Sequence, residues 1–323
     1  MALTTKWRQV GSGLSDRQKA ILLVFGAPRS GTTILNNLLY RHFGYGMGPE
    51  GTFVEAFAKQ LRRYGDLDQD KNLERLIADI SECRMLHIIR CRYGDHARFD
   101  VTPRLIRDRL TERSYAGVVY SVFQCMAELQ SCPRVGNKNP DYGRQFPLLQ
   151  RLFPTQAKYL CIVRDGRDVA LSIMKVRWGL RSSYIAAKAW SQSLVALAEM
   201  QRQLGHDRLH VLTYEDLLRR PRETLKGVRD FLGVPQAEAD IDAAVAELTR
   251  GRRAANFDKW KQQMSSRDLR LFEGVAGPML ERFGYELSGN PTEIRWSDQL
   301  VCETKELARL VRVNLKYRLS KLS

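Results

Sequence analysis

The sequence predicts an α/β fold in which a parallel sheet is flanked by helices and carries helical insertions and a C-terminal helix. Three observations predict it. Short apolar runs recur along the chain, segments with helical spacing of apolar residues separate them, and a glycine-bounded loop joins the first run to the first helical segment. Strands that alternate with helices form parallel sheets, because each helix carries the chain back to the edge where the next parallel strand begins. The clearest runs are 21–25, 158–163 and 209–212.

The first run, Ile21–Phe25, predicts a buried strand that ends at Gly26. After the turn 26–31, residues 32–42 predict a helix, because their apolar side chains recur at helical spacing. A helix-rich insertion is expected at about residues 53–130, with a helix start at Pro103.

The pattern of a parallel sheet then resumes. A short strand is expected at residues 134–136, followed by a loop at 137–140. The remaining helices are expected at residues 142–151, 166–175, 182–204 and 300–322. No repeat or linker divides the chain, so one domain over residues 1–323 is expected, with a core at about 21–285.

Composition limits the classes of partner. Lys and Arg total 52 against 36 Asp and Glu, a net charge of +16, which favours an anionic partner. The six cysteines lack metal-ligand spacing, so no metal site and no disulfide framework are expected. Residues 1–19 contain no apolar run of signal-peptide length, which favours a cytoplasmic protein. The basic amphipathic helix at 300–322 either docks on the domain or contacts an anionic membrane surface.

The loop 26–33, Gly-Ala-Pro-Arg-Ser-Gly-Thr-Thr, has the glycine spacing of a phosphate-binding loop. Its glycines let successive backbone N–H groups point at an anion, and the following helix adds its positive end. The lysine of nucleotide-triphosphate loops is missing, since Thr32 takes its place, and Arg29 is the nearest cation. Ser30, Gly31, Thr32 and Thr33 are therefore candidate anion ligands together with Arg29. A transferred sulfonate carries fewer charges than a triphosphate and fits this set.

A second candidate anion site follows the strand at 158–163. Arg164 ends this strand, and Ser172 comes eight residues later on a helix that Gly166 opens. Arginine supplies a charged fork and serine a hydroxyl donor, so the two can grip one phosphate from two directions.

These two motifs resemble those of the sulfotransferases that use PAPS (3′-phosphoadenosine 5′-phosphosulfate). Pro28–Thr33 resembles their 5′-phosphosulfate loop, and Ile162–Ser172 resembles their 3′-phosphate motif. The motif layout is most similar to the tyrosylprotein and carbohydrate enzymes, and it implies a fold of the P-loop type. The resemblance also places Tyr214 near the nucleotide and implies a helix at residues 221–232. It further makes Arg252, Arg253 and Lys259, in a basic loop, candidate phosphate contacts.

The resemblance also implies catalytic residues. Glu50, in a glycine-flanked setting 21 residues after Arg29, matches the catalytic glutamate of the tyrosylprotein enzymes and is the expected general base. His96 is the alternative base, while His42 and His87 are weaker candidates. Lys138, in Asn-Lys-Asn-Pro, is expected to neutralise charge on the leaving phosphate, with Arg29 as a further catalytic cation. One departure is Val176, where the tyrosylprotein enzymes carry an arginine.

The predicted function is transfer of a sulfonate group from PAPS to an acceptor hydroxyl, with PAP as the product and no metal required. The acceptor is a carbohydrate, a peptide tyrosine, a lipid or a natural product, and the basic insertion favours an anionic glycan or peptide. Two alternatives remain: a P-loop nucleotide kinase or NTPase without the usual lysine, and a basic nucleic-acid-binding protein. No aromatic-interleaved basic stripe supports the latter, so no nucleic acid is expected. Oligomeric state is not predicted.

Overall fold

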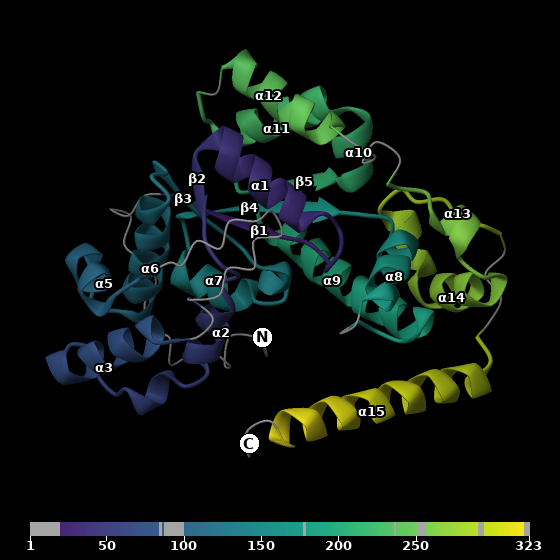
Figure 1. The fold of residues 1–323 in the computed structure, drawn as a ribbon, viewed down its shortest axis with the longest axis horizontal. Helices are drawn as coiled ribbons and strands as arrows, with labels where there is room; N and C mark the ends of the chain where they lie inside the picture. Colours follow the sequence, from purple (N-terminus) through teal and green to yellow (C-terminus); the bar gives the residue numbers. More distant parts are fainter. Residues whose placement is uncertain are drawn as a thin grey trace.

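The computed structural model describes residues 20–83, 86, 100–176, 179–235, 237–250, 256–289 and 294–319, and it describes the side chains of all of these except 310 and 312–319. The fold is built on a parallel sheet in which the first strand lies at the centre (Figure 1). The strands pair in the order β2-β3-β1-β4-β5. They are β1 (Ile21–Phe25), β2 (Tyr45–Met47), β3 (Arg134–Lys138), β4 (Ala157–Val163) and β5 (Leu209–Thr213). The predicted α/β fold with a flanked parallel sheet is confirmed.

Helices cover both faces of the sheet (Figure 1). Leu22 and Val24 of β1 pack with apolar residues of the helices on one face, whereas Ile21, Leu23 and Phe25 point to the other face. This division follows from the alternation of side chains along a strand. The first face carries α1 (Thr32–Phe43), α10 (Tyr214–Arg219), α11 (Pro221–Leu232) and α12 (Glu238–Thr249). The second face carries α6 (Tyr115–Leu129), α7 (Phe146–Leu152) and α9 (Ser183–Gln203).

The insertion between β2 and β3 is helical, as expected from the sequence. Its described elements are α2 (Thr52–Ala58), a 3-10 turn η2 (Leu61–Arg63), α3 (Asp70–Ser81), α5 (Pro103–Arg109) and α6. Pro103 begins α5, as predicted, and Thr102 caps it by accepting a hydrogen bond from the backbone N–H of Leu105.

Two predictions of local structure were wrong. The strand expected at 134–136 continues through Lys138, because Asn137 and Lys138 pair with Leu23 and Val24 of β1 and are buried there despite their polarity. The single helix expected at 142–151 is two elements, a 3-10 turn η3 (Pro140–Gly143) and α7. Pro147 lies in the first turn of α7, where its missing N–H costs no hydrogen bond.

Four further helices, one from the middle of the chain and three from its C-terminal part, complete the second side of the molecule. They are α8 (Gly166–Lys175), α13 (Trp260–Gln263), α14 (Ser266–Arg282) and α15 (Trp296–Leu319). The first half of α15 docks on the domain, since Cys302 is buried beside Tyr184 and Leu271, and Glu303 pairs with Lys188 at 2.7 Å. Among the described residues, no helix is both long and apolar enough to cross a membrane.

Candidate active site

The phosphate loop lies between β1 and α1, at the edge of the sheet where its parallel strands end (Figure 1). Ligands of open α/β sheets bind at this edge. Gly31 has a φ of 99°, and a Cβ atom at this position would lie 2.5 Å from the Tyr214 ring, so glycine is required here. Arg29 also has a positive φ, 76°, an uncommon conformation for a residue other than glycine. Such strain recurs at functional sites.

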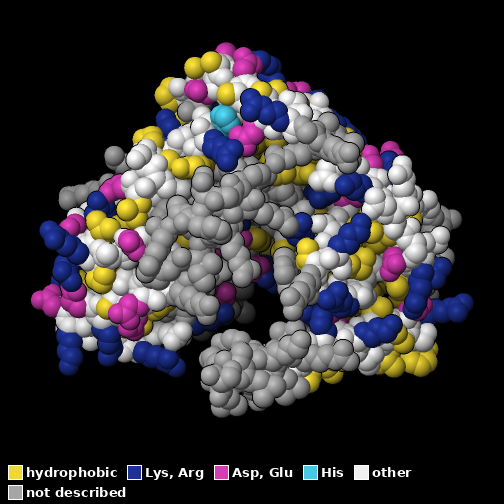
Figure 2. Space-filling view, viewed as in Figure 1, with side chains coloured by type: hydrophobic (Ala, Val, Ile, Leu, Met, Phe, Trp, Pro, Cys, Tyr) yellow, Lys and Arg dark blue, Asp and Glu magenta, His cyan; other side chains and the backbone are white. Residues whose placement is uncertain are grey.

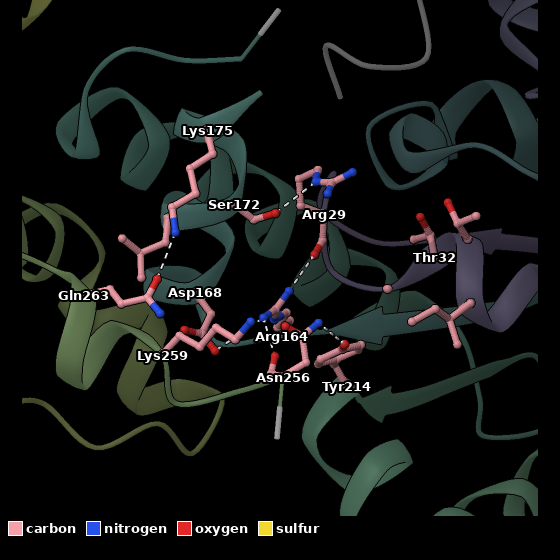
Figure 3. A pocket seen from close by; sticks show the side chains of 14 residues that line it. Arg29, Thr32, Arg164, Asp168, Ser172, Lys175, Tyr214, Asn256, Lys259 and Gln263 are labelled. Atoms are coloured by element: carbon pink, nitrogen blue, oxygen red, sulfur yellow. Dashed lines mark hydrogen bonds and ion pairs between the residues drawn. The ribbon is translucent and has the colours of Figure 1, made fainter. Parts of the chain in front are cut away.

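A cavity of about 330 Å³ opens beside this loop (Figure 3). Most of the predicted donor-binding residues line it: Arg29, Gly31, Thr32, Thr33, Arg164, Ser172, Tyr214 and Lys259. Ser30 does not. Its fully buried side chain faces a small cavity on the side of α9, and its hydroxyl has no partner among the described residues. The role predicted for Ser30 therefore stays a prediction, and it would involve the backbone.

The two predicted anion sites meet in this cavity. Arg164 follows β4 directly and donates from Nη1 to the Arg29 carbonyl oxygen at 3.2 Å, while its guanidinium lies 4.5 Å from the centre of the Tyr214 ring. Ser172 Oγ accepts a hydrogen bond from Arg29 Nε at 3.0 Å. The Nε group of Arg164 is buried and has no partner among the described residues. A buried donor without a partner costs free energy, which an anion in the cavity would relieve.

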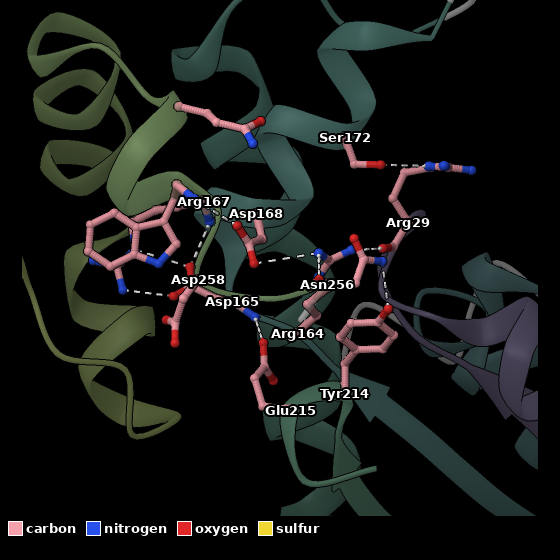
Figure 4. A network of polar contacts seen from close by, with 12 residues as sticks. Arg29, Arg164, Asp165, Arg167, Asp168, Ser172, Tyr214, Glu215, Asn256 and Asp258 are labelled. Atoms are coloured by element: carbon pink, nitrogen blue, oxygen red, sulfur yellow. Dashed lines mark hydrogen bonds and ion pairs between the residues drawn. The ribbon is translucent and has the colours of Figure 1, made fainter. Parts of the chain in front are cut away.

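The segment that follows residue 255 closes one wall of the cavity (Figure 4). Its backbone is held at both ends: the Asn256 carbonyl oxygen accepts from Arg164 Nη2 at 2.7 Å, and Asp168 Oδ1 accepts from the Trp260 N–H at 3.0 Å. The Asn256 side chain donates to the Tyr214 hydroxyl at 2.8 Å. Burial raises the pKa of Asp168 above its ordinary value, and the Arg164 guanidinium opposes this rise.

A buried ion network around Arg167 lies against the Trp260 ring. Arg167 pairs with Asp165 at 2.8 Å and with Glu273 at 2.6 Å, and its guanidinium lies 3.5 Å from the Trp260 ring centre. The arginine- and aspartate-rich turn at 164–168 thus has a structural part as well. Arg164 faces the cavity, whereas Arg167 anchors its wall.

Glu50 and Lys138, two of the three predicted catalytic residues, form an ion pair although they lie 88 residues apart in the sequence. Lys138 ends β3 directly beside Val24 of β1, which places it next to the start of the phosphate loop. Its side chain is mostly buried, whereas the Glu50 side chain is about half exposed. An exposed carboxylate beside a buried ammonium is accessible to an incoming hydroxyl group.

Asn137 holds the segment that carries Glu50, a role that the sequence did not reveal. Its fully buried side chain accepts from the Gly51 N–H at 2.9 Å and from the Tyr142 hydroxyl at 2.7 Å, and it donates to the Pro49 carbonyl at 2.9 Å. Burial raises the pKa of the Tyr142 hydroxyl, and the Glu50 charge adds to this rise. Tyr142 therefore stays protonated and donates.

Other predicted residues either make structural contacts or lie outside the described part of the chain. His42 lies at the far end of α1 and contacts Glu247 at 3.0 Å, which accords with a structural role. The alternative bases His87 and His96 lie outside the described residues, as do the basic residues Arg252 and Arg253, so their roles stay predictions.

Lys175 and Gln263, which were missed in the sequence analysis, also line the cavity. Lys175 could have been found from its position one helical turn after Ser172. No cluster of metal-ligating side chains occurs in the described part of the chain.

The family model that matches this chain and two of its curated relatives are named as sulfotransferases. A family model described as the sulfotransferase family matches residues 22–238. A protein-tyrosine sulfotransferase of Drosophila melanogaster is 23% identical over 301 residues, which cover 86% of this chain and 54% of that protein. Protein-tyrosine sulfotransferase A of Caenorhabditis elegans is 22% identical, covering 90% of this chain and 74% of that protein. The chain thus spans about half the length of the Drosophila relative.

A solved structure shows the same fold. The sulfotransferase domain of the olefin synthase from Synechococcus PCC 7002 superimposes with a TM-score of 0.51 at 22% identity. The match covers 85% of this chain and 99% of that domain.

Proposed function

The chain belongs to the sulfotransferase family, and we propose that it transfers a sulfonate group from PAPS to an acceptor hydroxyl and releases PAP. One observation carries the proposal. A single cavity is lined by two sets of anion-binding groups, the phosphate loop with Arg29 and the pair Arg164 and Ser172. PAPS carries two separate anionic groups, a 5′-phosphosulfate and a 3′-phosphate, and it needs one set for each.

The predicted residues divide the chemistry between them. Glu50 takes the proton of the acceptor hydroxyl group while the hydroxyl oxygen of the acceptor forms its bond to sulfur. Lys138 and Arg29 neutralise the charge that builds up as the bond between sulfur and the bridging oxygen breaks. The electron pair of that bond leaves with PAP. The contact of Glu50 with Lys138 supports this division, because it brings the base and the cation together next to the phosphate loop.

Family membership favours this function over a nucleotide kinase or a nucleic-acid-binding protein. Thr32 in place of the loop lysine agrees with it, because triphosphate chemistry relies on that lysine and on magnesium. Calorimetry tests the donor directly. PAP should bind without magnesium and more tightly than ATP with magnesium. Tighter binding of ATP with magnesium would refute the proposal.

We propose a hydroxyl-bearing acceptor, with peptide tyrosine as the first candidate because two of the relatives above are named protein-tyrosine sulfotransferases. Labelled PAPS should be offered to tyrosine peptides with acidic or neutral flanks and to carbohydrate, lipid and small phenolic acceptors. Label on the peptides that depends on their tyrosine supports this choice. Label on another class alone would refute peptide tyrosine and leave the donor assignment intact.

We also propose that α15 makes the peripheral contact with an anionic membrane that the sequence suggested, in a cytoplasmic setting. Trp296, Leu300, Leu307 and Val311 are all exposed, and their spacing keeps them on one side of the helix. Lys305 adds positive charge to the same helix, whereas Arg309 pairs with Glu306. Vesicles with anionic lipid should sediment the protein, and neutral vesicles should not. Leu307→Asp should abolish this binding, whereas Val195→Asp, at an exposed apolar position on α9, should retain it. Equal binding of both variants would refute the contact.

A further inference from the structure

Lys175 occupies a position in the donor cavity to which no predicted function was attached. It is the last residue of α8 and lies one helical turn after Ser172, so the two side chains share one side of the helix. Both line the cavity (Figure 3). Lys175 Nζ donates a hydrogen bond to Gln263 Oε1 of α13 at 2.8 Å, which bridges the mouth of the cavity. Both side chains are exposed, so this contact holds the ammonium group at the solvent-facing rim of the cavity.

The charges around the cavity indicate that this ammonium group contributes to anion binding. Asp168 lines the same cavity and is fully buried, and it lies 3.5 Å from Arg164, so part of the Arg164 charge is already compensated. Lys175 differs from Arg164, because its partner Gln263 is neutral and it forms no ion pair with any described residue. Figure 2 shows Lys and Arg side chains gathered over the flank where α8, α13 and α14 lie. A dianionic group placed between Arg164 and Ser172 would thus meet a further uncompensated positive charge.

We propose that Lys175, positioned by Gln263, binds the 3′-phosphate of the donor nucleotide and sets the preference for 3′-phosphorylated nucleotides. The inference rests on the proposed function, since it names a specificity residue of the same site. Ser172 Oγ already accepts from Arg29, which leaves its hydrogen to donate to the phosphate. Arg164 adds the unpartnered Nε–H, and Lys175 adds a further positive charge, held by Gln263. Gln263 keeps the ammonium group in place before the ligand arrives and limits the entropy lost on binding.

The experiment compares two ligands, PAP and AMP, which differ by the 3′-phosphate alone. Calorimetry on the full chain should give a ratio of dissociation constants, AMP over PAP, for each variant. Lys175→Gln should weaken PAP binding about tenfold and change AMP binding less than about twofold, because a charge-assisted hydrogen bond to a phosphate contributes on this scale. Lys175→Arg should keep most of the ratio.

Two further variants sharpen the test. Lys226→Gln removes the same charge from α11, where Lys226 pairs with Glu238 and does not line the cavity, so its ratio should equal that of the wild type. Gln263→Glu places a carboxylate against Lys175 and should lower the ratio as Lys175→Gln does. Binding of labelled PAPS at increasing salt should also show a shallower salt dependence for Lys175→Gln than for Lys226→Gln.

The possible outcomes distinguish the role of Lys175 from the identity of the donor. An unchanged ratio in Lys175→Gln, or an equal loss for PAP and AMP, would overturn the role of Lys175 and leave the sulfotransferase assignment untouched. A wild-type protein that binds AMP as tightly as PAP would instead overturn the donor proposed above. A lowered ratio in Lys175→Gln and Gln263→Glu, with a normal ratio in Lys226→Gln, supports the inference.

Discussion

Replacing Asn137 with alanine removes the side chain that ties the Glu50 segment to the sheet. Three buried hydrogen bonds are lost, to the Gly51 N–H, the Tyr142 hydroxyl and the Pro49 carbonyl. Each such bond contributes about 1 kcal/mol, so the free energy of unfolding should fall by about 3 kcal/mol. The Asn137 side chain is fully buried. Water therefore cannot fully replace the hydrogen bonds that its three partners lose.

The assay is urea unfolding combined with amide hydrogen exchange of the peptide that contains Gly51. Asn137→Ala should lower the midpoint and speed the exchange of the Gly51 amide under native conditions. Tyr142→Phe is the matched control, because it removes one of the three bonds and leaves both contacts with the loop. It should lose about 1 kcal/mol and keep the Gly51 amide protected. PAP binding should be unchanged in both variants, since neither residue lines the donor cavity.

Two results would refute this reasoning. One is a loss in Asn137→Ala no larger than that in Tyr142→Phe. The other is unchanged exchange of the Gly51 amide, which would mean that the loop keeps its place without Asn137. In an assay with a competent acceptor, Asn137→Ala should lower kcat and leave the KM for PAPS near that of the wild type. An equal effect on both would indicate general unfolding and not misplacement of Glu50.

Three further predictions concern the site and the stability of the fold. Glu50→Gln should bind PAP like the wild type and turn over about a hundredfold more slowly, and a fully active variant in a transfer assay would reassign the base to His96 or another group. Arg29→Ala and Ser172→Ala should each weaken PAP binding about tenfold in calorimetry, while the double variant should lose less than the product, because the two side chains are 3.0 Å apart. Strict additivity would contradict the coupling. His210 stacks on Phe231, and burial lowers its pKa below the ordinary 6.5. Its neutral form therefore stabilises the fold above pH 6.5, and this contribution is lost as the pH falls through the lowered pKa. The unfolding free energy of His210→Gln should show less of this acid loss than the wild type, and parallel pH curves would count against it.

Much of the fold could be predicted because it depends on local patterns. The strand Ile21–Phe25 and the helix Gly166–Lys175 have the boundaries expected from the sequence. Strand β2 was missed because it depends on tertiary packing. It is three residues long and contains Gly46, where a Cβ atom would lie 2.2 Å from the Cα of Ala127, so its strand geometry follows from close packing against α6 and not from an apolar run.

The candidate site divides in the same way. The sequence by itself determined the glycine-bounded loop and the placement of Arg164 at a strand end and Ser172 on the helix that follows, because both depend on neighbours within about ten residues. The tertiary structure decided which of these groups meet. Arg29 and Ser172 are 143 residues apart, and Lys138 and Glu50 are 88 apart, as are Lys175 and Gln263. Such contacts depend on the order and register of the strands, which place β3, β1 and β4 side by side. A local pattern of residues does not specify strand order or register, so it cannot show which of these distant residues come into contact.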